Sequence, residues 1–475
     1  MKQVKKLLAC MLVVILVLAV IGCAPQKVEN QPAATGASAA GGETTAAAEG
    51  GASAEPVTIS FWKWIPTEGL QTDSLVEAWN KQYPNIKLNI THVGESEAHF
   101  QKLSAALAAG EGPTILALQV GARANQYKEF CEPLKPLAEA KWGADWENKF
   151  LAAALEQCRY SGGDYTVLPG GMTATPVIQY NATAFKKLGI TKAPETMDEL
   201  RHVIEVSKSD PNIIPGIGIG AKEGWTCRDV FMGIVNQVAP GKVYDAQEGK
   251  ASFKDPEFVE SFKIWQDLFK SGIFAAGSLG VALYPDINDN FALAGTKGGK
   301  YYIMENCGTW HGSGLTKVAV EDGIKNGTRA SDMNLGFFTL PPVKEGAKQN
   351  MVVTVDVAWG LNKAASDAEK KAGFEFVAWM AAGEGQTIWT NTLQVLPAAK
   401  GIDLSQAKGD MYGETEKQAL EMAQKFVENN AGPREIRYAE IANAMNDALV
   451  AVAGGTMTPE KAAESLQTAS ESTTR

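Results

Sequence analysis

The chain has 475 residues, too many for one compact core, so two lobes or domains are expected. Its 45% hydrophobic and 21% charged residues are typical of a soluble globular protein. The formal net charge is −10, and it becomes −13 if the first 22 residues are removed with their three lysines. Such an acidic balance argues against nucleic-acid binding and against direct adsorption to anionic lipid.

Residues 1–22 have the pattern of a signal peptide. Lys2, Lys5 and Lys6 precede an apolar run over 7–21, and Gly22 stands directly before Cys23. The run is shorter than the roughly 20 residues that a membrane-spanning helix needs. A cysteine after this pattern resembles the lipobox of bacterial lipoproteins, in which the thiol is lipidated. The alternative is an ordinary signal peptide followed by an incidental cysteine.

Residues 24–55 form a low-complexity segment with no aromatic residue, no Ile or Leu and a single Val. Such a segment cannot bury enough apolar surface to fold. As a flexible coil it has a reach of about 30 Å. We therefore expect 23–55 to tether a folded body, beginning at residue 56, to a membrane surface.

The folded body begins with strands that alternate with helices. Strands are predicted over 57–62, 86–92 and 113–118, with helices over 70–83 and 100–109 between them, and residues 119–123 lead into another helix. This order predicts a doubly wound, mainly parallel sheet, whose carboxyl-end loops line a ligand crevice. The residues in those loops are Trp62, Lys63, Trp64, Glu68, Glu95, Ser96, Glu97, Gln119 and Arg123.

The stretch 168–189 is predicted to connect two α/β units. Leu168-Pro-Gly-Gly171 indicates a break, 176–180 reads as extended, and 181–189 reads as a short helix. Extended segments marked by proline at 335–342 and 393–397 predict a second and a third crossover. Ligand clefts form where such crossovers join two units, so we expect a hinged cleft here.

The rest of the body reads as further helices and strands. Helices are predicted over 197–207, 225–238, 256–271, 367–382, 383–392 and 438–453, with a last one after Thr458, and strands over 213–220, 301–304 and 352–361. Trp79, Trp265 and Trp379 lie on apolar helix faces and are expected in the core.

Several side chains are suited to a sugar, because aromatic rings cover its C–H faces while carboxylates, amides and arginine bind its hydroxyls. The aromatic candidates are Trp62, Trp64, Tyr180, Trp225 and Trp310. Asp356 is either a hydroxyl acceptor in the cleft or a paired core carboxylate, since an unpaired buried charge is costly. For the remaining candidates a solvated surface role is equally open, and these are Glu68, Glu97, Gln119, Asn306 and Arg437.

The order of several motifs carries a family resemblance over residues 57–468. These motifs are ISFWKW, AWNKQYPNIKLNI, PTILALQVG, QYNATAFKKLGI, PETMDELRHVI, GKYYIMENCGTW, LGFFTLPPV, FEFVAWMAAGEGQTIWT and GGTMTPEKAAESLQ. The chain resembles the extracellular solute-binding proteins of bacterial ABC importers, in the sugar-binding group that includes maltose-binding protein. It departs from the group in VTVDVAWGL, where Asp356 replaces a residue that is small in many relatives.

The resemblance implies a two-lobed periplasmic-binding-protein-like α/β fold, each lobe a doubly wound, mainly parallel sheet, joined by three crossovers with a hinge. We expect lobe 1 to comprise 56–170 plus 342–396, and lobe 2 to comprise 171–341 plus 397–475. The implied function is that of a membrane-tethered monomeric lipoprotein, outside the cytoplasm, that closes over a carbohydrate, expected to be an oligosaccharide, and delivers it to the permease of an ABC importer.

The motifs of common enzymes are not present in the sequence. The four histidines lack HExxH spacing, His311-Gly-Ser-Gly314 is not GxSxG, and no phosphate-binding GxxxxGK[ST] occurs. No catalytic residue, metal or cofactor is therefore expected. The alternatives are a binding protein for another polar solute, a surface glycoside-active enzyme, and a sensory or adhesive lipoprotein. A phosphate ligand is disfavoured because the candidate loops hold few Arg or Lys.

The body contains four cysteines, Cys131, Cys158, Cys227 and Cys307. They could form two disulfides in three pairings, or remain as reduced, buried thiols. No pair has CxxC spacing, which argues against a metal site.

Overall fold

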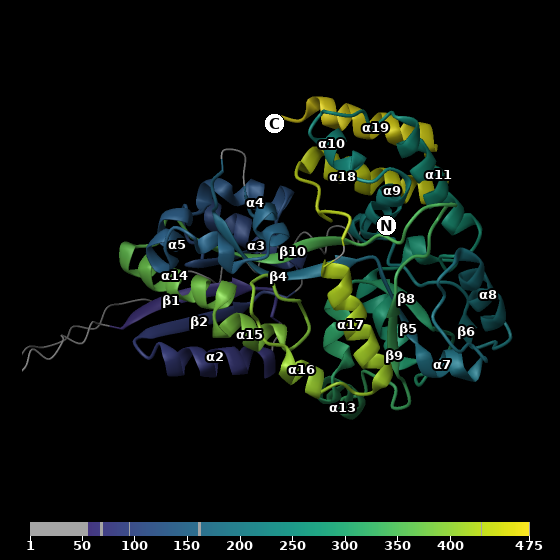
Figure 1. Ribbon diagram of the computed structural model, residues 1–475, viewed down its shortest axis with the longest axis horizontal. Coiled ribbons are helices and arrows are strands. Elements are labelled where there is room, and N and C mark those ends of the chain that lie inside the picture. Colours follow the sequence, from purple (N-terminus) through teal and green to yellow (C-terminus); the bar gives the residue numbers. More distant parts are fainter. Residues whose placement is uncertain (1–55, 67–69, 95, 160–162, 429, 475) are drawn as a thin grey trace, which may run out of the picture. The chain divides into compact units, whose positions relative to one another are not determined.

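The computed structural model describes residues 56–475 apart from 67–69, 95, 160–162, 429 and 475 (Figure 1). The predicted signal peptide, the tether with Cys23, and the candidate Glu68 lie outside the described residues. Within the described part of the chain, no helix has both the length and the apolar character needed to cross a membrane.

The first sheet has the strand order β2-β1-β3-β10-β4. β1 (Val57–Lys63) pairs in parallel with β2 (Ile86–His92) and β3 (Ile115–Leu118), as predicted. β10 (Val352–Leu361) is antiparallel to both of its neighbours, β3 and β4 (Val167–Thr175). The one reversed strand of this sheet is therefore the strand that joins it from far along the chain.

The helices predicted around this sheet are present. They are α2 (Leu70–Gln82), α3 (Ser96–Ala108), α14 (Asp367–Ala382) and α15 (Glu384–Thr390). In Figure 1, α3 lies on one side of the strands, while α2, α14 and α15 lie on the other. Trp79 of α2 is fully buried and meets Phe376 of α14 edge to face, with 5.0 Å between the ring centroids. The prediction that Trp79, Trp265 and Trp379 belong to the core is confirmed.

The second sheet has the order β8-β5-β9. β5 (Val177–Asn181) is antiparallel to β8 (Met304–Cys307) and to β9 (Leu335–Phe338). β6 (Ile213–Ile214) and β7 (Tyr301–Tyr302) form a separate parallel pair. The reversed strand of this sheet is β5, which enters directly from the first sheet because only Pro176 separates it from β4.

Helices pack around the second sheet at the predicted places, namely α7 (Ala182–Lys187), α8 (Met197–Ser207), α9 (Gly224–Val238), α11 (Pro256–Lys270), α18 (Ala439–Ala453) and α19 (Pro459–Ser472). Their starts follow from local sequence signals. Thr196 and Glu199 form a reciprocal capping box at α8, and the Thr458 hydroxyl accepts a hydrogen bond from the backbone N–H of Lys461 at α19.

Several elements were not predicted. The short ones are η1 (Lys128–Phe130), α5 (Lys135–Trp142), η2 (Trp146–Lys149), α6 (Ala152–Gln157), α10 (Lys242–Gln247), η3 (Ser278–Gly280), η4 (Leu283–Ile287), α12 (Asn288–Leu293), η5 (Thr309–Leu315), α13 (Lys317–Lys325) and α16 (Ser405–Gly409). α17 (Glu414–Glu428) is longer, and it contacts β9 of the second sheet as well as β4 and β10 of the first. The helix expected after the third strand is present as α4 (Ala122–Tyr127).

The break predicted at 168–171 is wrong, because β4 runs through it without interruption. Two compensating register shifts in the pairing with β10 accommodate this segment. The glycines serve close packing: a Cβ on Gly170 would lie 2.5 Å from the Trp359 ring, and one on Gly171 would lie 2.4 Å from Val395. The segment 393–397 also stays beside β4, since Leu396 and Met172 exchange two backbone hydrogen bonds.

Candidate ligand-binding cavity

A cavity of about 990 Å³ lies among residues from both sheets and their connections. Trp64 directly after β1, His92 at the end of β2 and Gln119 directly after β3 line the cavity, so the carboxyl ends of these strands face it as predicted. The second sheet and its helices contribute Gln179, Trp225, Asp229, Trp310 and His311. The volume and the mixed lining suit a polar small molecule.

Six of the candidate residues line this cavity, namely Trp64, Glu97, Gln119, Trp225, Trp310 and Asp356. They come from six separate stretches of the chain. The rings of Trp225 and Trp310 have centroids 6.3 Å apart and an interplanar angle of 52°. Trp64 is largely buried, and its ring packs on His99 and Phe100.

Four candidates are not in the lining: Trp62, Tyr180, Asn306 and Arg437. Trp62 is half-buried on β1, and the Lys102 ammonium lies 4.4 Å from its ring centroid. Tyr180 packs its ring on Phe185. Asn306 is buried within β8, and Arg437 is exposed and paired with Glu248.

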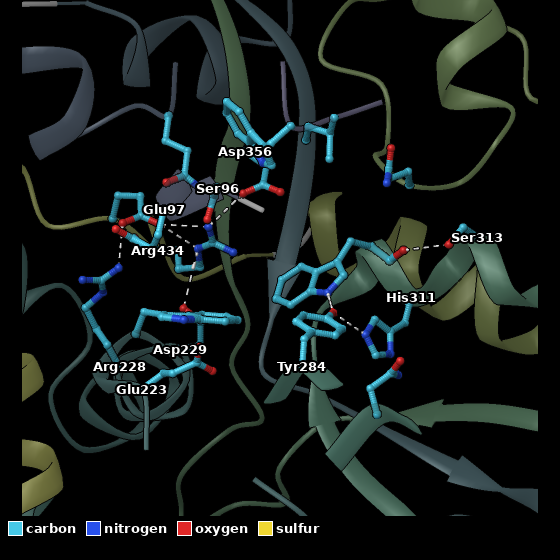
Figure 2. Close-up of a pocket in the computed structure, with 18 of the residues that line it drawn as sticks. Ser96, Glu97, Glu223, Arg228, Asp229, Tyr284, His311, Ser313, Asp356 and Arg434 are labelled. Atoms are coloured by element: carbon cyan, nitrogen blue, oxygen red, sulfur yellow. Dashed lines mark hydrogen bonds and ion pairs between the residues drawn. The ribbon is translucent and has the colours of Figure 1, made fainter. Parts of the chain in front are cut away.

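The centre of the cavity wall is an ionic network around Arg434, which we name the Arg434 network and which comprises Arg434, Arg228, Asp229, Asp356 and Glu435. Arg434 Nη2 donates to Asp356 Oδ1 at 3.0 Å and lies 2.9 Å from Glu435 Oε1. Arg434 Nε lies 3.7 Å from Asp229 Oδ1, and Arg228 Nη2 donates to Glu435 Oε2 at 3.0 Å. Figure 2 shows Arg434 between Asp356 and Asp229.

Burial and charge act against each other in this network. Burial raises the pKa of Asp229 to about 7, although Arg434 and Arg228 oppose that rise. Burial also raises the pKa of Asp356 above its usual range against the opposing effect of Arg434. For Glu435 burial acts in the same direction, but Arg228 and Arg434 outweigh it and lower the pKa. Of the two readings of Asp356, a cleft acceptor or a paired carboxylate, the structure shows a paired carboxylate that also lines the cavity.

A directional hydrogen-bond chain holds the aromatic side of the cavity. Trp310 Nε1–H donates to the Tyr284 hydroxyl oxygen at 2.7 Å, which leaves the hydroxyl proton to be donated to His311 Nε2 at 2.6 Å. With Nε2 as acceptor, His311 Nδ1–H donates to Gln179 Oε1 at 2.8 Å and lies 3.2 Å from Glu305 Oε1. Glu305 is fully buried on β8, so the chain ties the Trp310 ring to the second sheet.

The other guanidinium groups of the lining are already engaged. Arg123 is ion-paired with Glu97 and lies over the Phe100 ring. Arg329 donates to the backbone oxygens of Gly314 and Met333. Across the part of the chain that the structure describes, no group of three His, Cys, Asp or Glu side chains is arranged to hold a metal ion.

Four residues of the Arg434 network were not identified from the sequence: Arg228, Asp229, Arg434 and Glu435. One signal for them is present in the sequence: Arg228 and Asp229 interrupt an otherwise apolar helix face, and Arg434 and Glu435 stand between Pro433 and Ile436. Charges in such apolar surroundings are expected to be paired. Their partners could not be read from the sequence, because they lie about 200 positions apart.

The four cysteines of the body are free and buried. Burial raises the pKa of Cys131 and of Cys227 to about 12, and it raises the pKa of Cys158 and Cys307 as well. Of the two alternatives left open by the sequence, the structure therefore shows reduced, buried thiols.

Comparisons with known proteins agree with this architecture. The profile of a family described as bacterial extracellular solute-binding protein matches residues 74–417. Among curated proteins, the sn-glycerol-3-phosphate-binding periplasmic protein UgpB of Escherichia coli K12 is 22% identical over 368 residues, which cover 74% of this chain and 77% of that protein.

Solved structures show the same fold. A protein from a study of xylan utilization by Caldanaerobius polysaccharolyticus is 21% identical with a TM-score of 0.70, over 87% of this chain and 99% of that chain. Maltose-bound MalE3 of T. maritima is 20% identical with a TM-score of 0.68, over 88% and 99% of the two chains. The predicted two-lobed periplasmic-binding-protein-like α/β fold is thereby confirmed.

Proposed function

Because the chain belongs to the family of bacterial extracellular solute-binding proteins, we propose that it captures an extracellular carbohydrate, an oligosaccharide in particular, and delivers it to the permease of an ABC importer. The observation that carries this proposal is the pairing of aromatic and polar groups in one cavity. Trp64, Trp225 and Trp310 line the same space as Gln119 and Asp356. Aromatic faces and hydrogen-bonding groups together match the two surfaces of a sugar ring.

The protein acts by closing over its solute rather than by converting it. We propose lobe boundaries at 56–170 plus 342–396 and at 171–341 plus 397–475, with the hinge in the crossovers between them. The lobes then approach each other across the cavity, and the closed form is the one that the permease recognises. Binding without turnover is tested by recovering the sugar unchanged after prolonged incubation with the protein.

We further propose that Cys23 is lipidated and that residues 24–55 tether the monomeric body to the outer face of the cell membrane. This proposal rests on the sequence pattern alone. Replacing Cys23 by Ser is expected to move the protein from the membrane fraction to the soluble fraction. Retention in the membrane fraction by that variant would contradict the anchor.

A phosphorylated polyol is a second candidate, because the curated relatives are named as sn-glycerol-3-phosphate-binding proteins. The arginines of the cavity argue against this candidate, because each of them already has a partner. Arg123, Arg228 and Arg434 are each ion-paired with a carboxylate, and Arg329 is hydrogen-bonded to backbone oxygens. A phosphate would have to displace one of these partners, because it needs donors of its own.

The experiment is a thermal-shift screen of residues 56–475 against mono- and oligosaccharides, with glycerol 3-phosphate as the competing candidate. A ligand at a hundred times its Kd stabilises the folded state by about 2.7 kcal/mol, which shifts Tm visibly. Trp310→Ala is expected to abolish the Tm shift. The matched control is Trp62→Ala, which removes a half-buried tryptophan outside the cavity and is expected to leave the Tm shift unchanged. A shift with glycerol 3-phosphate and with no sugar would overturn the carbohydrate proposal.

A further inference from the structure

The start of α9 brings charged groups to the cavity wall. Glu223 precedes the helix, and Arg228 and Asp229 follow within it. Figure 2 shows these three side chains on one side of Arg434, with Asp356 on the opposite side. Asp229, the carboxylate that α9 contributes to the lining, is deeply buried, with 2% of the residue exposed.

Asp229 has weaker partners than its neighbours in the network. Arg434 directs its donors to Asp356 and Glu435, and it meets Asp229 only at 3.7 Å, which is beyond hydrogen-bonding distance. Arg228 donates to Glu435 and Asn446 instead. Among the residues that the structure describes, none donates a hydrogen bond to the Asp229 carboxylate.

Glu223 adds a carboxylate that has no cation beside it, next to Asp229, which shares Arg434 with two other carboxylates. Its Oε2 accepts a hydrogen bond from the backbone N–H of Leu283, and no Lys, Arg or His of the described chain lies within ion-pair distance of it. The full lining holds five carboxylates, on Glu97, Glu223, Asp229, Asp356 and Glu435, against four guanidinium groups. Asp229 is deeply buried, accepts no hydrogen bond from the described residues, and shares the single charge of Arg434 with Asp356 and Glu435. Such a carboxylate is costly, so its position at a cavity wall indicates a group that arrives with the solute.

We propose that the solute is cationic: a sugar with a protonated amine, whose ammonium is bound by Asp229 with Glu223 beside it. This inference rests on the proposed carbohydrate function. An ammonium supplies both the donors that Asp229 lacks and the positive charge that the lining lacks. The rings of Trp225 and Trp310 line the same cavity as Asp229, which places aromatic surface for the sugar face beside this carboxylate.

The test compares sugars in pairs that differ only in the amine. Glucosamine and glucose form one pair, galactosamine and galactose a second, and β-1,4-linked tetramers of glucosamine and of glucose a third. Binding of each to the full chain is measured by calorimetry at pH 7. We expect the amine member of at least one pair to bind about tenfold tighter or more than its neutral partner.

Two variants locate the preference. Asp229→Asn keeps the shape of the side chain and is expected to reduce the amine preference to about threefold or less, and Glu223→Gln is expected to reduce it partly. Asp447→Asn is the matched control, because it removes the same charge from an exposed position of α18 outside the cavity lining. Thermal unfolding of every variant shows whether it is folded, and Glu223→Gln carries the test if Asp229→Asn does not fold.

The outcomes separate the two proposals. An amine preference that survives in both Asp229→Asn and Glu223→Gln overturns the assignment of these carboxylates. Neutral sugars that bind as tightly as their amines in every pair overturn the inference and leave the carbohydrate function standing. If no member of any pair binds, the carbohydrate function fails and the inference fails with it.

Discussion

Replacing Arg434 by Met removes the charge at the centre of the Arg434 network while keeping much of the side-chain volume. The Arg434 side chain is 6% exposed and lies within 2.9–3.7 Å of carboxylate oxygens on Asp229, Asp356 and Glu435. Removing one partner of a buried ion pair typically costs about 3–5 kcal/mol, because the other charge is left uncompensated. We expect a loss of this size at pH 8.

The loss is expected to shrink as the pH falls. Arg434 lowers the pKa of Asp229, of Asp356 and of Glu435, so each pKa rises in the variant. A carboxyl group whose pKa is higher in the folded than in the unfolded state destabilises the fold above its unfolded pKa of roughly 4, and the penalty grows as the pH rises through its folded pKa. At pH 4.5 the penalty is therefore much smaller than at pH 8.

The assay is urea unfolding followed by tryptophan fluorescence at both pH values. Arg437→Met is the control, because Arg437 lies three positions further on and its ion pair with Glu248 is 44% exposed at the arginine. Exposed pairs contribute about 0–1 kcal/mol. If the two variants lose the same free energy of unfolding at pH 8, or if the loss in Arg434→Met does not depend on pH, the account of the network is refuted.

Three further predictions concern the hydrogen-bond chain at Trp310, the packing of β4 and the buried cysteines. Tyr284→Phe keeps the ring but removes the hydroxyl that accepts a hydrogen bond from Trp310. We expect calorimetry to show a sugar affinity lower by about threefold to tenfold, with Tm nearly unchanged. An unchanged affinity would show that the hydrogen-bond chain does not position the Trp310 ring. Gly170→Ala is expected to lower the free energy of unfolding in urea by about 1–3 kcal/mol, because its Cβ would clash with Trp359. Gly409→Ala is the control and should be neutral or slightly stabilising, because the space around Gly409 is open. Equal effects of the two substitutions would show that Gly170 is not required for close packing. A thiol reagent such as DTNB should leave the four buried cysteines, Cys131, Cys158, Cys227 and Cys307, unmodified until urea unfolds the body. Rapid modification of the native protein would contradict their burial.

Local structure was largely readable from the sequence. Alternation over 57–62 and helical periodicity over 197–207 correctly identified β1 and α8, because both patterns depend on residues close together in the chain. The capping signals at Thr196 and Thr458 are local in the same way. The prediction of a break at 168–171 is wrong because glycine is also required where a side chain from elsewhere packs closely. At Gly170 that side chain is Trp359, which belongs to another strand and could not be anticipated from the local sequence.

Part of the cavity was also accessible from the sequence. Trp64 and Gln119 follow parallel strands, and the carboxyl ends of such strands meet at one edge of a sheet. Trp62 and Tyr180 sit in equally suggestive positions, yet alternate side chains of a strand point to opposite faces. Which face turns toward the cavity depends on how the second sheet packs, and a single strand does not contain that information.

The sequence by itself determined the two-lobed α/β architecture, the family, and the aromatic and carboxylate composition of a ligand site. Only the tertiary structure decided that Arg434 bridges Asp229 on α9 and Asp356 on β10, and that Arg228 meets Glu435. These groups are separated by up to about 200 positions in the chain, and a buried charge selects its partner by proximity in space. The balance of charge in the cavity is therefore a property of the folded molecule, since it depends on which carboxylates are left without a guanidinium once the sheets have packed.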